Sequence, residues 1–174
     1  MNLNNIDVKQ VRDYKEVIKK DPKEAKFTAK IEGDWLLVEG GPQFRSTVKV
    51  KEGTYSMEAS HPNFAGPGSR PGPMAFGLFW FAACYSSTFV TEAAVQNIRL
   101  TAVKTKVEAD LDYTAQFDLG EKPLISEYRV IMEVSGDVTY AQVQDLKDYA
   151  LGRCMGMFTI QHAIPLKAEA RLIR

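Results

Sequence analysis

The longest charge-free stretch of the chain lies between Arg70 and Glu92 and reads PGPMAFGLFWFAACYSSTFVT. Pro73 suits the first turn of a helix, where its missing N–H needs no partner, so we expect a helix from Pro73 to about Asn97. A membrane span would need ~20 mostly apolar residues, but the apolar part of this stretch, residues 74–83, is only half as long. The pattern therefore favours a helix that is apolar on nearly every side and buried in a core or between subunits.

The remaining patterns predict mostly strands. Apolar residues at helical spacing indicate one charged helix from about Asn5 to Lys20, ended by Asp21-Pro22. Alternating apolar and polar residues predict an antiparallel meander, then a long hairpin and a final strand; the segments are residues 26–31, 35–38, 47–50 and 55–59, then 98–117 and 126–136, then 164–173. Residues 60–73 hold too many prolines and glycines for a helix or a central strand and are expected to form a loop.

A second main helix is expected to begin after Thr139, because Thr139 and Gln142 have the spacing of a capping box. Its inner face is predicted to carry Tyr140, Val143, Leu146, Ala150 and Cys154. Gly152 and Gly156 loosen the backbone on either side of Cys154, near which a short turn can restart. The order of elements predicts an α+β fold with helices packed against antiparallel sheet.

Composition excludes several classes of function. A chain of 174 residues is about one domain, and 22 basic against 22 acidic residues give no overall field for nucleic acid or an anionic membrane. The N-terminus lacks the features of a secretory signal, so we expect a cytoplasmic protein with reduced cysteines. His61 and His162 have no metal-ligand spacing, so we expect neither a metal nor a cofactor.

The candidate chemistry lies in two cysteines, Cys84 in the apolar helix and Cys154 where the second helix breaks. They are either small buried apolar residues or a reactive thiol pair. The aromatic residues around Cys84 are likewise either core or the lining of a pocket for an apolar substrate; they are Phe76, Phe79, Trp80, Phe81 and Tyr85.

Together these segments resemble the OsmC/Ohr superfamily of thiol-dependent peroxide reductases. The matching features are the Pro-rich loop, Pro73, the segment LFWFAAC that ends in Cys84, the hairpin, and Cys154 followed by MGMFTIQHAIPLKAEARLI. The resemblance covers roughly residues 24–174, which we assign as an OsmC-like domain preceded by a helical extension over residues 1–23.

The resemblance implies an intertwined homodimer with two active sites at the subunit interface. Cys84 would attack the O–O bond of an organic hydroperoxide, and Cys154 would resolve the sulfenic acid as a disulfide. A dithiol reductant of the lipoyl type would then restore both thiols. An apolar site disfavours the thiolate, and Arg45, which follows Gly40-Gly41, matches the family's activating arginine. Arg70 is a second candidate, and His61, Phe81 and Trp80 are further candidates for binding.

Two positions depart from the family pattern. The family has a glutamate directly after the helix-opening proline, where this chain has Met74, and it commonly has proline where this chain has Met155. Glu58 or His61 could approach in place of the glutamate. Three hypotheses follow: a two-cysteine hydroperoxide reductase, a non-catalytic dimer of the same fold that binds a small apolar ligand or a partner, and a redox-sensing or structural dimer whose thiols never meet.

Overall fold

The computed structural model describes residues 2–61 and 64–173. The chain folds into two compact units. The cysteine unit comprises residues 2–8, 81–107 and 129–173, and the sheet unit comprises residues 9–61, 64–80 and 108–128. The predicted domain boundary after residue 23 stays a prediction.

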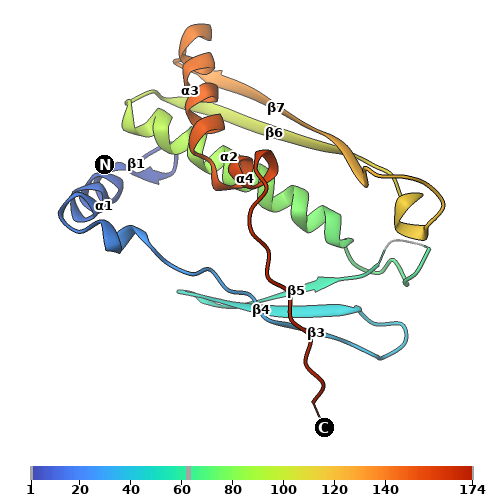
Figure 1. Cartoon of the computed structure of the whole chain (residues 1–174). Coiled ribbons are helices and arrows are strands. Elements are labelled where there is room, and N and C mark those ends of the chain that lie inside the picture. The colour runs from blue at the N-terminus through green and yellow to red at the C-terminus, as the bar shows by residue number, and fades with distance from the viewer. Residues whose placement is uncertain (1, 62–63, 174) are drawn as a thin grey trace. The chain divides into compact units, whose positions relative to one another are not determined.

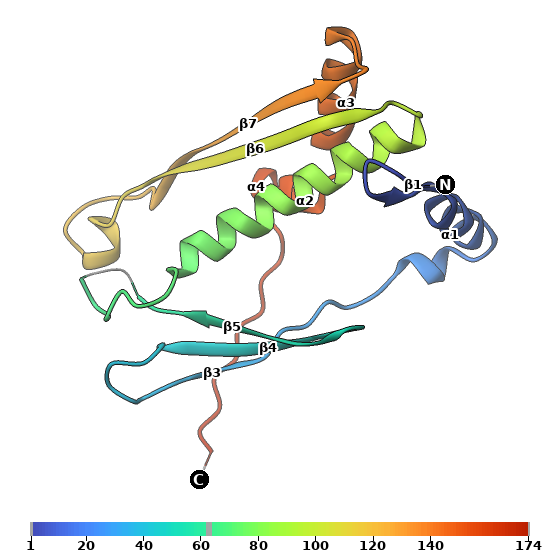
Figure 2. The same cartoon turned by 180° about the vertical axis from the view of Figure 1, so that it is seen from behind.

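The cysteine unit is built around the apolar helix α2 (Pro73–Val95), which enters it at Phe81. Strands β6 (Leu100–Leu111) and β7 (Ile125–Gly136) form a long two-stranded ribbon (Figure 2). Helices α3 (Tyr140–Arg153) and α4 (Met155–Gln161) follow. The core of this unit joins α2 to α3 and α4 through large or tightly packed side chains; these are Phe81, Tyr85, Phe89, Ala93, Leu146, Ala150, Cys154 and Met157.

The sheet unit contains almost all of helix α1 (Val8–Lys20) and a three-stranded sheet. Its strands β3 (Gly33–Trp35), β4 (Phe44–Val50) and β5 (Gly53–Ala59) lie side by side in that order and are antiparallel (Figure 1). Two short 3₁₀ turns, η1 (Pro22–Ala25) and η2 (Ala115–Phe117), complete the unit. Arg45 lies directly opposite Glu58 in the ladder, so both side chains project from the same face of the sheet.

Local signals predicted several elements well. The apolar helix begins at Pro73 as expected and ends two residues before Asn97. Thr139 caps α3, and its side chain and that of Gln142 form the predicted reciprocal capping box. The mixed α+β fold is confirmed, and the strands predicted over residues 47–50 and 55–59 lie within β4 and β5.

The predicted start of the first helix at Asn5 is wrong. Strands β1 (Asn2–Leu3) and β2 (Ile6–Asp7) form a small hairpin there, and α1 begins only at Val8. Asn4 and Asn5 both have positive φ, 54° and 62°, as a tight two-residue hairpin turn requires. The Asn4 side chain also donates to the Ile98 carbonyl and accepts from the Leu100 N–H, which anchors the hairpin beside the start of β6.

Two predicted strands do not form, and of a third, predicted over residues 35–38, only Trp35 lies in a strand, as the last residue of β3. Residues 26–31 and 164–173 have no strand pairing, although both alternate apolar and polar side chains. A strand needs a neighbour whose backbone completes the ladder, and within the described part of the chain neither segment has one. Tyr140 is also 80 % exposed, because it is the first residue of α3 and lies beyond the core that buries Leu146 and Ala150.

Helix α2 is covered on only part of its surface. Phe81, Tyr85 and Phe89 are buried, but Phe79 and Trp80 are 70 % and 46 % exposed. By length and composition, α2 is also apolar enough to cross a membrane, a criterion that core helices of soluble proteins meet as well. A single chain therefore does not bury the whole helix.

Candidate functional site

The two cysteine thiols meet. Sγ of Cys154 lies 3.3 Å from Sγ of Cys84 and is placed to donate a hydrogen bond to it. Both are free thiols; Cys154 is buried and Cys84 is half-buried. This contact contradicts the hypothesis that the thiols never meet.

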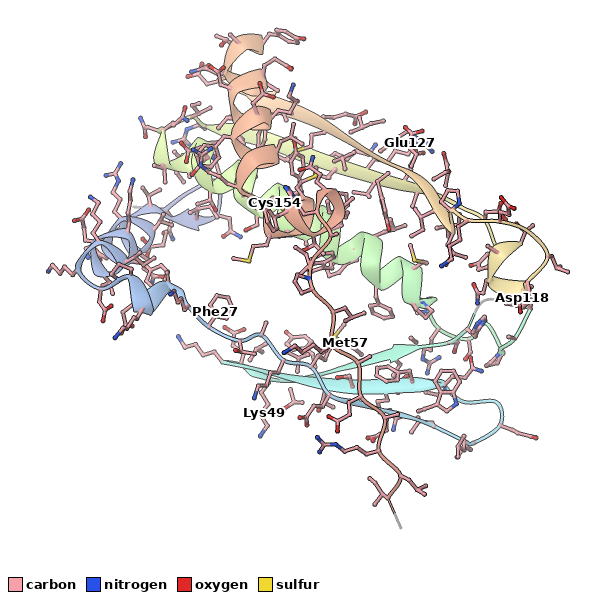
Figure 3. The ribbon with its side chains drawn as sticks, viewed as in Figure 1. Phe27, Lys49, Met57, Asp118, Glu127 and Cys154 are labelled. Carbon is pink, nitrogen blue, oxygen red and sulfur yellow. The ribbon has the colours of Figure 1, made fainter. Side chains whose placement is uncertain are left out.

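Backbone geometry at the junction of α3 and α4 positions Cys154 (Figure 3). Cys154 has extended dihedral angles, φ −76° and ψ 124°, so the chain turns there between the two helices. Its N–H still donates to the Ala150 carbonyl, and its own carbonyl accepts from the Phe158 N–H, both at 2.9 Å. The inward direction predicted for Cys154 is confirmed, since 1 % of the residue is exposed.

Gly156 lets α4 approach α2 closely. A Cβ atom at this position would lie 3.2 Å from the Phe81 ring, 3.5 Å from Cβ of Cys84 and 3.6 Å from Sγ of Cys154. From the sequence alone, we expected Gly156 only to loosen the backbone next to Cys154. Its structural role is to leave space for the two sulfur atoms and for Phe81.

Opposing effects act on the Cys84 thiol. Burial raises the pKa of Cys84, because the thiolate loses hydration. Hydrogen bonds from the backbone N–H groups of Gly156 and Met155 act to lower that pKa, since they favour the charged sulfur. Burial is the larger effect, so the pKa of Cys84 lies above its ordinary value.

In the sheet unit, Glu58 joins the two candidate arginines. Its carboxylate lies 2.8 Å from Nη2 of Arg45 through one oxygen and 2.8 Å from Nε of Arg70 through the other. These hydrogen bonds, the one from Arg70 foremost, lower the pKa of the Glu58 carboxyl. Of the two residues that could take the place of the glutamate missing after Pro73, Glu58 or His61, Glu58 forms ion pairs with both arginines. The role of Arg45 or Arg70 toward Cys84 stays a prediction.

The other predicted binding residues belong partly to the cysteine unit and partly to the sheet unit. Phe81 is 2 % exposed and packs in the core beside the cysteines. His61 belongs to the sheet unit, where its ring meets the Phe64 ring edge-on at 4.8 Å. Trp80 is partly exposed on α2. Among the described residues, no group of three or more His, Cys, Asp or Glu side chains is placed to hold a metal ion.

A cavity of about 390 Å³ lies beside Cys154 within the cysteine unit. It is lined mainly by residues of the α3–α4 junction, and the extended C-terminal segment adds one more; the lining includes Arg153, Cys154, Met155, Phe158, Thr159 and Ile164. The sequence pattern did not single out Arg153. The signal in the sequence that could have pointed to Arg153 is its position directly before the candidate cysteine Cys154.

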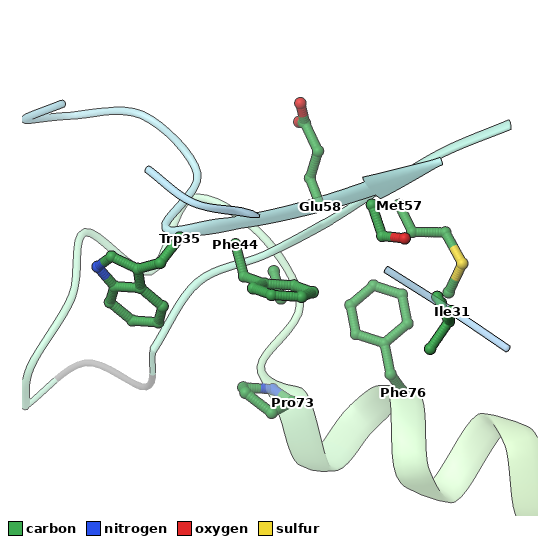
Figure 4. Close-up of a pocket in the computed structure, with 9 residues that line it drawn as sticks. Ile31, Trp35, Phe44, Met57, Glu58, Pro73 and Phe76 are labelled. Atoms are coloured by element: carbon green, nitrogen blue, oxygen red, sulfur yellow. The ribbon is translucent and has the colours of Figure 1, made fainter. Parts of the chain in front are cut away.

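The sheet unit has an apolar cavity of its own, of about 370 Å³ (Figure 4). Large apolar side chains form most of its wall; they include Ile31, Trp35, Phe44, Met57, Pro73 and Phe76. The carboxylate of Glu58 points away from these side chains. The ion pairs with arginine and the apolar cavity therefore lie on opposite faces of the sheet.

Comparison with known proteins bears on the fold and the family of this chain. No curated protein matches the sequence. One similar solved structure is an OsmC-like protein from Mycoplasma pneumoniae, with 18 % sequence identity and a TM-score of 0.55; the match covers 78 % of this chain and 89 % of that one. Another is an organic hydroperoxide resistance protein OsmC from Legionella pneumophila, with 19 % sequence identity and a TM-score of 0.54; the match covers 78 % of this chain and 92 % of that one. At this identity they show a shared fold. The model of the OsmC-like protein family matches residues 66–169, which is more than half of the chain and includes both cysteines, so the chain belongs to the OsmC-like protein family.

Proposed function

We propose that this protein is a thiol-dependent reductase of organic hydroperoxides, with Cys84 as the peroxidatic and Cys154 as the resolving cysteine. The observation that carries the proposal is the 3.3 Å separation of their sulfur atoms. The similar structure from Legionella pneumophila, which is described as an organic hydroperoxide resistance protein, supports the same class of reaction.

Exposure distinguishes the two sulfur atoms. Cys84 is half-buried, whereas Cys154 is buried, so a hydroperoxide reaches Cys84 first. The Cys84 thiolate attacks the terminal oxygen of the hydroperoxide, the O–O bond breaks, and the departing alkoxide takes a proton to become an alcohol. Cys84 is thereby oxidised to a sulfenic acid.

Cys154 then resolves the sulfenic acid. Its sulfur attacks Sγ of Cys84 and displaces hydroxide, which leaves as water once it takes the proton of the Cys154 thiol. The sulfurs must move from 3.3 Å to the disulfide bond length of about 2.05 Å. A dithiol reduces the disulfide and is itself oxidised, so the net reaction converts a hydroperoxide and a dithiol into an alcohol, water and a disulfide.

Thiolate formation is the step that needs most help from the protein, because burial raises the pKa of Cys84. The N–H groups of Met155 and Gly156 supply part of that help within the cysteine unit. By the family resemblance, Arg45 supplies the positive charge.

The test is consumption of cumene hydroperoxide by the purified protein in the presence of dithiothreitol. We expect turnover by the wild-type protein and none by Cys84→Ser, whose folding is checked by circular dichroism. An equal rate of hydroperoxide consumption by the wild-type protein and Cys84→Ser would contradict the proposal.

A second candidate function is favoured by the apolar cavity of the sheet unit. A volume of about 370 Å³ lined by Trp35, Phe44, Met57 and Phe76 suits a small apolar ligand, which a non-catalytic member of the family would bind. Saturable binding of 8-anilinonaphthalene-1-sulfonate that Phe76→Asp abolishes, without peroxide turnover by the wild-type protein, would favour this function over the first. Robust thiol-dependent turnover would exclude it.

We also propose that the protein is a homodimer. The exposed Phe79 and Trp80 side chains on α2 give a partner subunit an apolar surface to cover. Light scattering during size-exclusion chromatography is expected to give a mass twice that of the 19.5 kDa chain. The substitution Trp80→Glu is expected to lower this mass toward that of the monomer. A monomeric mass for the wild-type protein would contradict the homodimer.

A further inference from the structure

A polar contact, which we call the Glu92–Tyr149 clip, joins α2 to α3 within the cysteine unit. The hydroxyl group of Tyr149 on α3 donates a hydrogen bond to the carboxylate of Glu92 on α2. The side-chain amide of Gln96 donates to the same carboxylate across 2.9 Å. The guanidinium carbon of Arg153 lies 4.2 Å from the centre of the Tyr149 ring, in a cation–π contact. Both members of the clip are thus held in place by a second side chain.

The clip connects the same two helices as the thiol pair, but at a different level. Glu92 lies about two turns of α2 beyond Cys84, and Tyr149 lies about one and a half turns of α3 before Cys154. The core side chains that also join α2 to α3 are mostly apolar, and apolar packing has no preferred direction. A hydrogen bond at this second level therefore restricts how α3 is oriented on α2.

The orientation of α3 matters because it determines where the resolving sulfur lies. Cys154 directly follows the last residue of α3, so a small rotation of this helix moves its sulfur relative to Cys84. The two sulfur atoms are 3.3 Å apart and must close to about 2.05 Å to form the disulfide. Misplacement of reacting groups by about 1 Å can slow such a step about a hundredfold.

We propose that Glu92 and Tyr149 are positioning residues for disulfide formation, and that their hydrogen bond holds α3 so that the sulfur of Cys154 stays within reach of Cys84. The proposal rests on the two-cysteine function proposed above and adds the residues that align its resolving step. Both residues act through the orientation of the helices and not on the reacting sulfur atoms. Without the clip, α3 of the reduced protein samples more orientations, and the thiols meet less often.

The test measures the equilibrium between the protein and a glutathione redox buffer. Two glutathione thiols reduce the Cys84–Cys154 disulfide to two protein thiols and become glutathione disulfide. The equilibrium constant of this exchange is the effective concentration of one protein thiol at the other. The protein disulfide is first formed with diamide, so no hydroperoxide takes part. Absence of hydroperoxide turnover would therefore contradict the proposed function and leave this measurement intact.

Tyr149→Phe removes the hydroxyl group and keeps the ring. We expect it to lower the effective concentration about fivefold, the size of one hydrogen bond, and so to raise the reduction potential of the cysteine pair by about 20 mV. Glu92→Ala should have the same effect, whereas Glu92→Gln keeps an acceptor oxygen and should retain most of the wild-type value. The matched control is Tyr140→Phe, which removes a hydroxyl group from the exposed first residue of α3 and should change nothing.

The double variant Tyr149→Phe/Glu92→Ala shows whether the two side chains act as a pair. If they do, the second substitution lowers the effective concentration no further. An unchanged effective concentration in Tyr149→Phe, an equal loss in Tyr140→Phe, or losses that add in the double variant would overturn the proposal. Circular dichroism checks the folding of each variant. If Tyr149→Phe did not fold, equal values for Glu92→Ala and Glu92→Gln would overturn the proposal instead.

Discussion

The thiol of Cys154 reaches the sulfur of Cys84 across 3.3 Å, although 70 residues of chain separate them. Two features make this contact possible: the turn between α3 and α4 at Cys154, and the missing side chain of Gly156, next to both cysteines. The pair is asymmetric, since one sulfur is half-buried and the other buried. That asymmetry underlies the roles proposed for each.

Replacing the resolving thiol should stop the reaction at the sulfenic acid. In Cys154→Ser, Cys84 still reacts with a hydroperoxide, but a hydroxyl cannot form the disulfide. We expect labelling of Cys84 by dimedone in this variant and little labelling in the wild-type protein, where both thiols disappear together. Mass spectrometry of the labelled peptides measures this, and strong labelling of the wild-type protein would contradict a resolving role for Cys154.

Gly156→Ala should disturb the thiol pair. The added methyl group would lie 3.2 Å from the Phe81 ring, closer than ordinary packing allows, in a core that has little room to give. We expect the free energy of unfolding to fall by about 1 kcal/mol and disulfide formation to slow. Urea unfolding and thiol titration measure the two effects.

Gly152→Ala is the matched control for that variant. Gly152 lies in the last turn of α3, and a Cβ there would meet nothing within 4 Å. Alanine should raise the free energy of unfolding by about 0.5–1 kcal/mol, because it lowers the entropy of the unfolded chain. If Gly156→Ala stabilised the protein as Gly152→Ala does, the close packing at Gly156 would be refuted.

Glu58 should make stability depend on pH in the acid range. Hydrogen bonds from Arg70 and Arg45 lower the pKa of Glu58 from 4.5. The ionised carboxylate therefore stabilises the folded protein fully above about pH 4.5, and this stabilisation is lost as the pH falls through the lower pKa of the folded state. We expect Glu58→Gln to unfold at a lower temperature than the wild-type protein at about pH 7, and the difference to shrink toward about pH 3. A difference that is constant across this range would contradict the ion pairs.

The reactivity of Cys84 should rise with pH to an alkaline plateau. Burial raises the pKa of Cys84 above 9.0, and only the thiolate reacts with iodoacetamide. Alkylation of Cys84 in the reduced protein should therefore accelerate about tenfold per pH unit through neutral pH. The protein unfolded in urea, followed by mass spectrometry in the same way, is the control and should level off at lower pH. A plateau at lower pH in the folded protein than in the unfolded protein would contradict this direction.

Local sequence signals were enough to predict the main helices of this protein and the direction of one cysteine. Pro73 and the charge-free stretch after it determine the start and extent of α2, and Thr139 with Gln142 determines the start of α3, because each acts through neighbours a few residues away. The inward direction of Cys154 followed from helical periodicity in the same way. Local patterns in the amino-acid sequence were thus sufficient to identify the two cysteines as the candidate chemistry.

Only the tertiary structure decided which side chains meet. The contact of Cys84 with Cys154, the close approach at Gly156 and the cavity beside Arg153 depend on how α2, α3 and α4 pack, and periodicity along one helix does not determine that packing. The same limit explains the wrong prediction of a strand over residues 164–173. Alternation makes a segment able to pair, but a strand forms only where another backbone lies beside it to complete the hydrogen bonds.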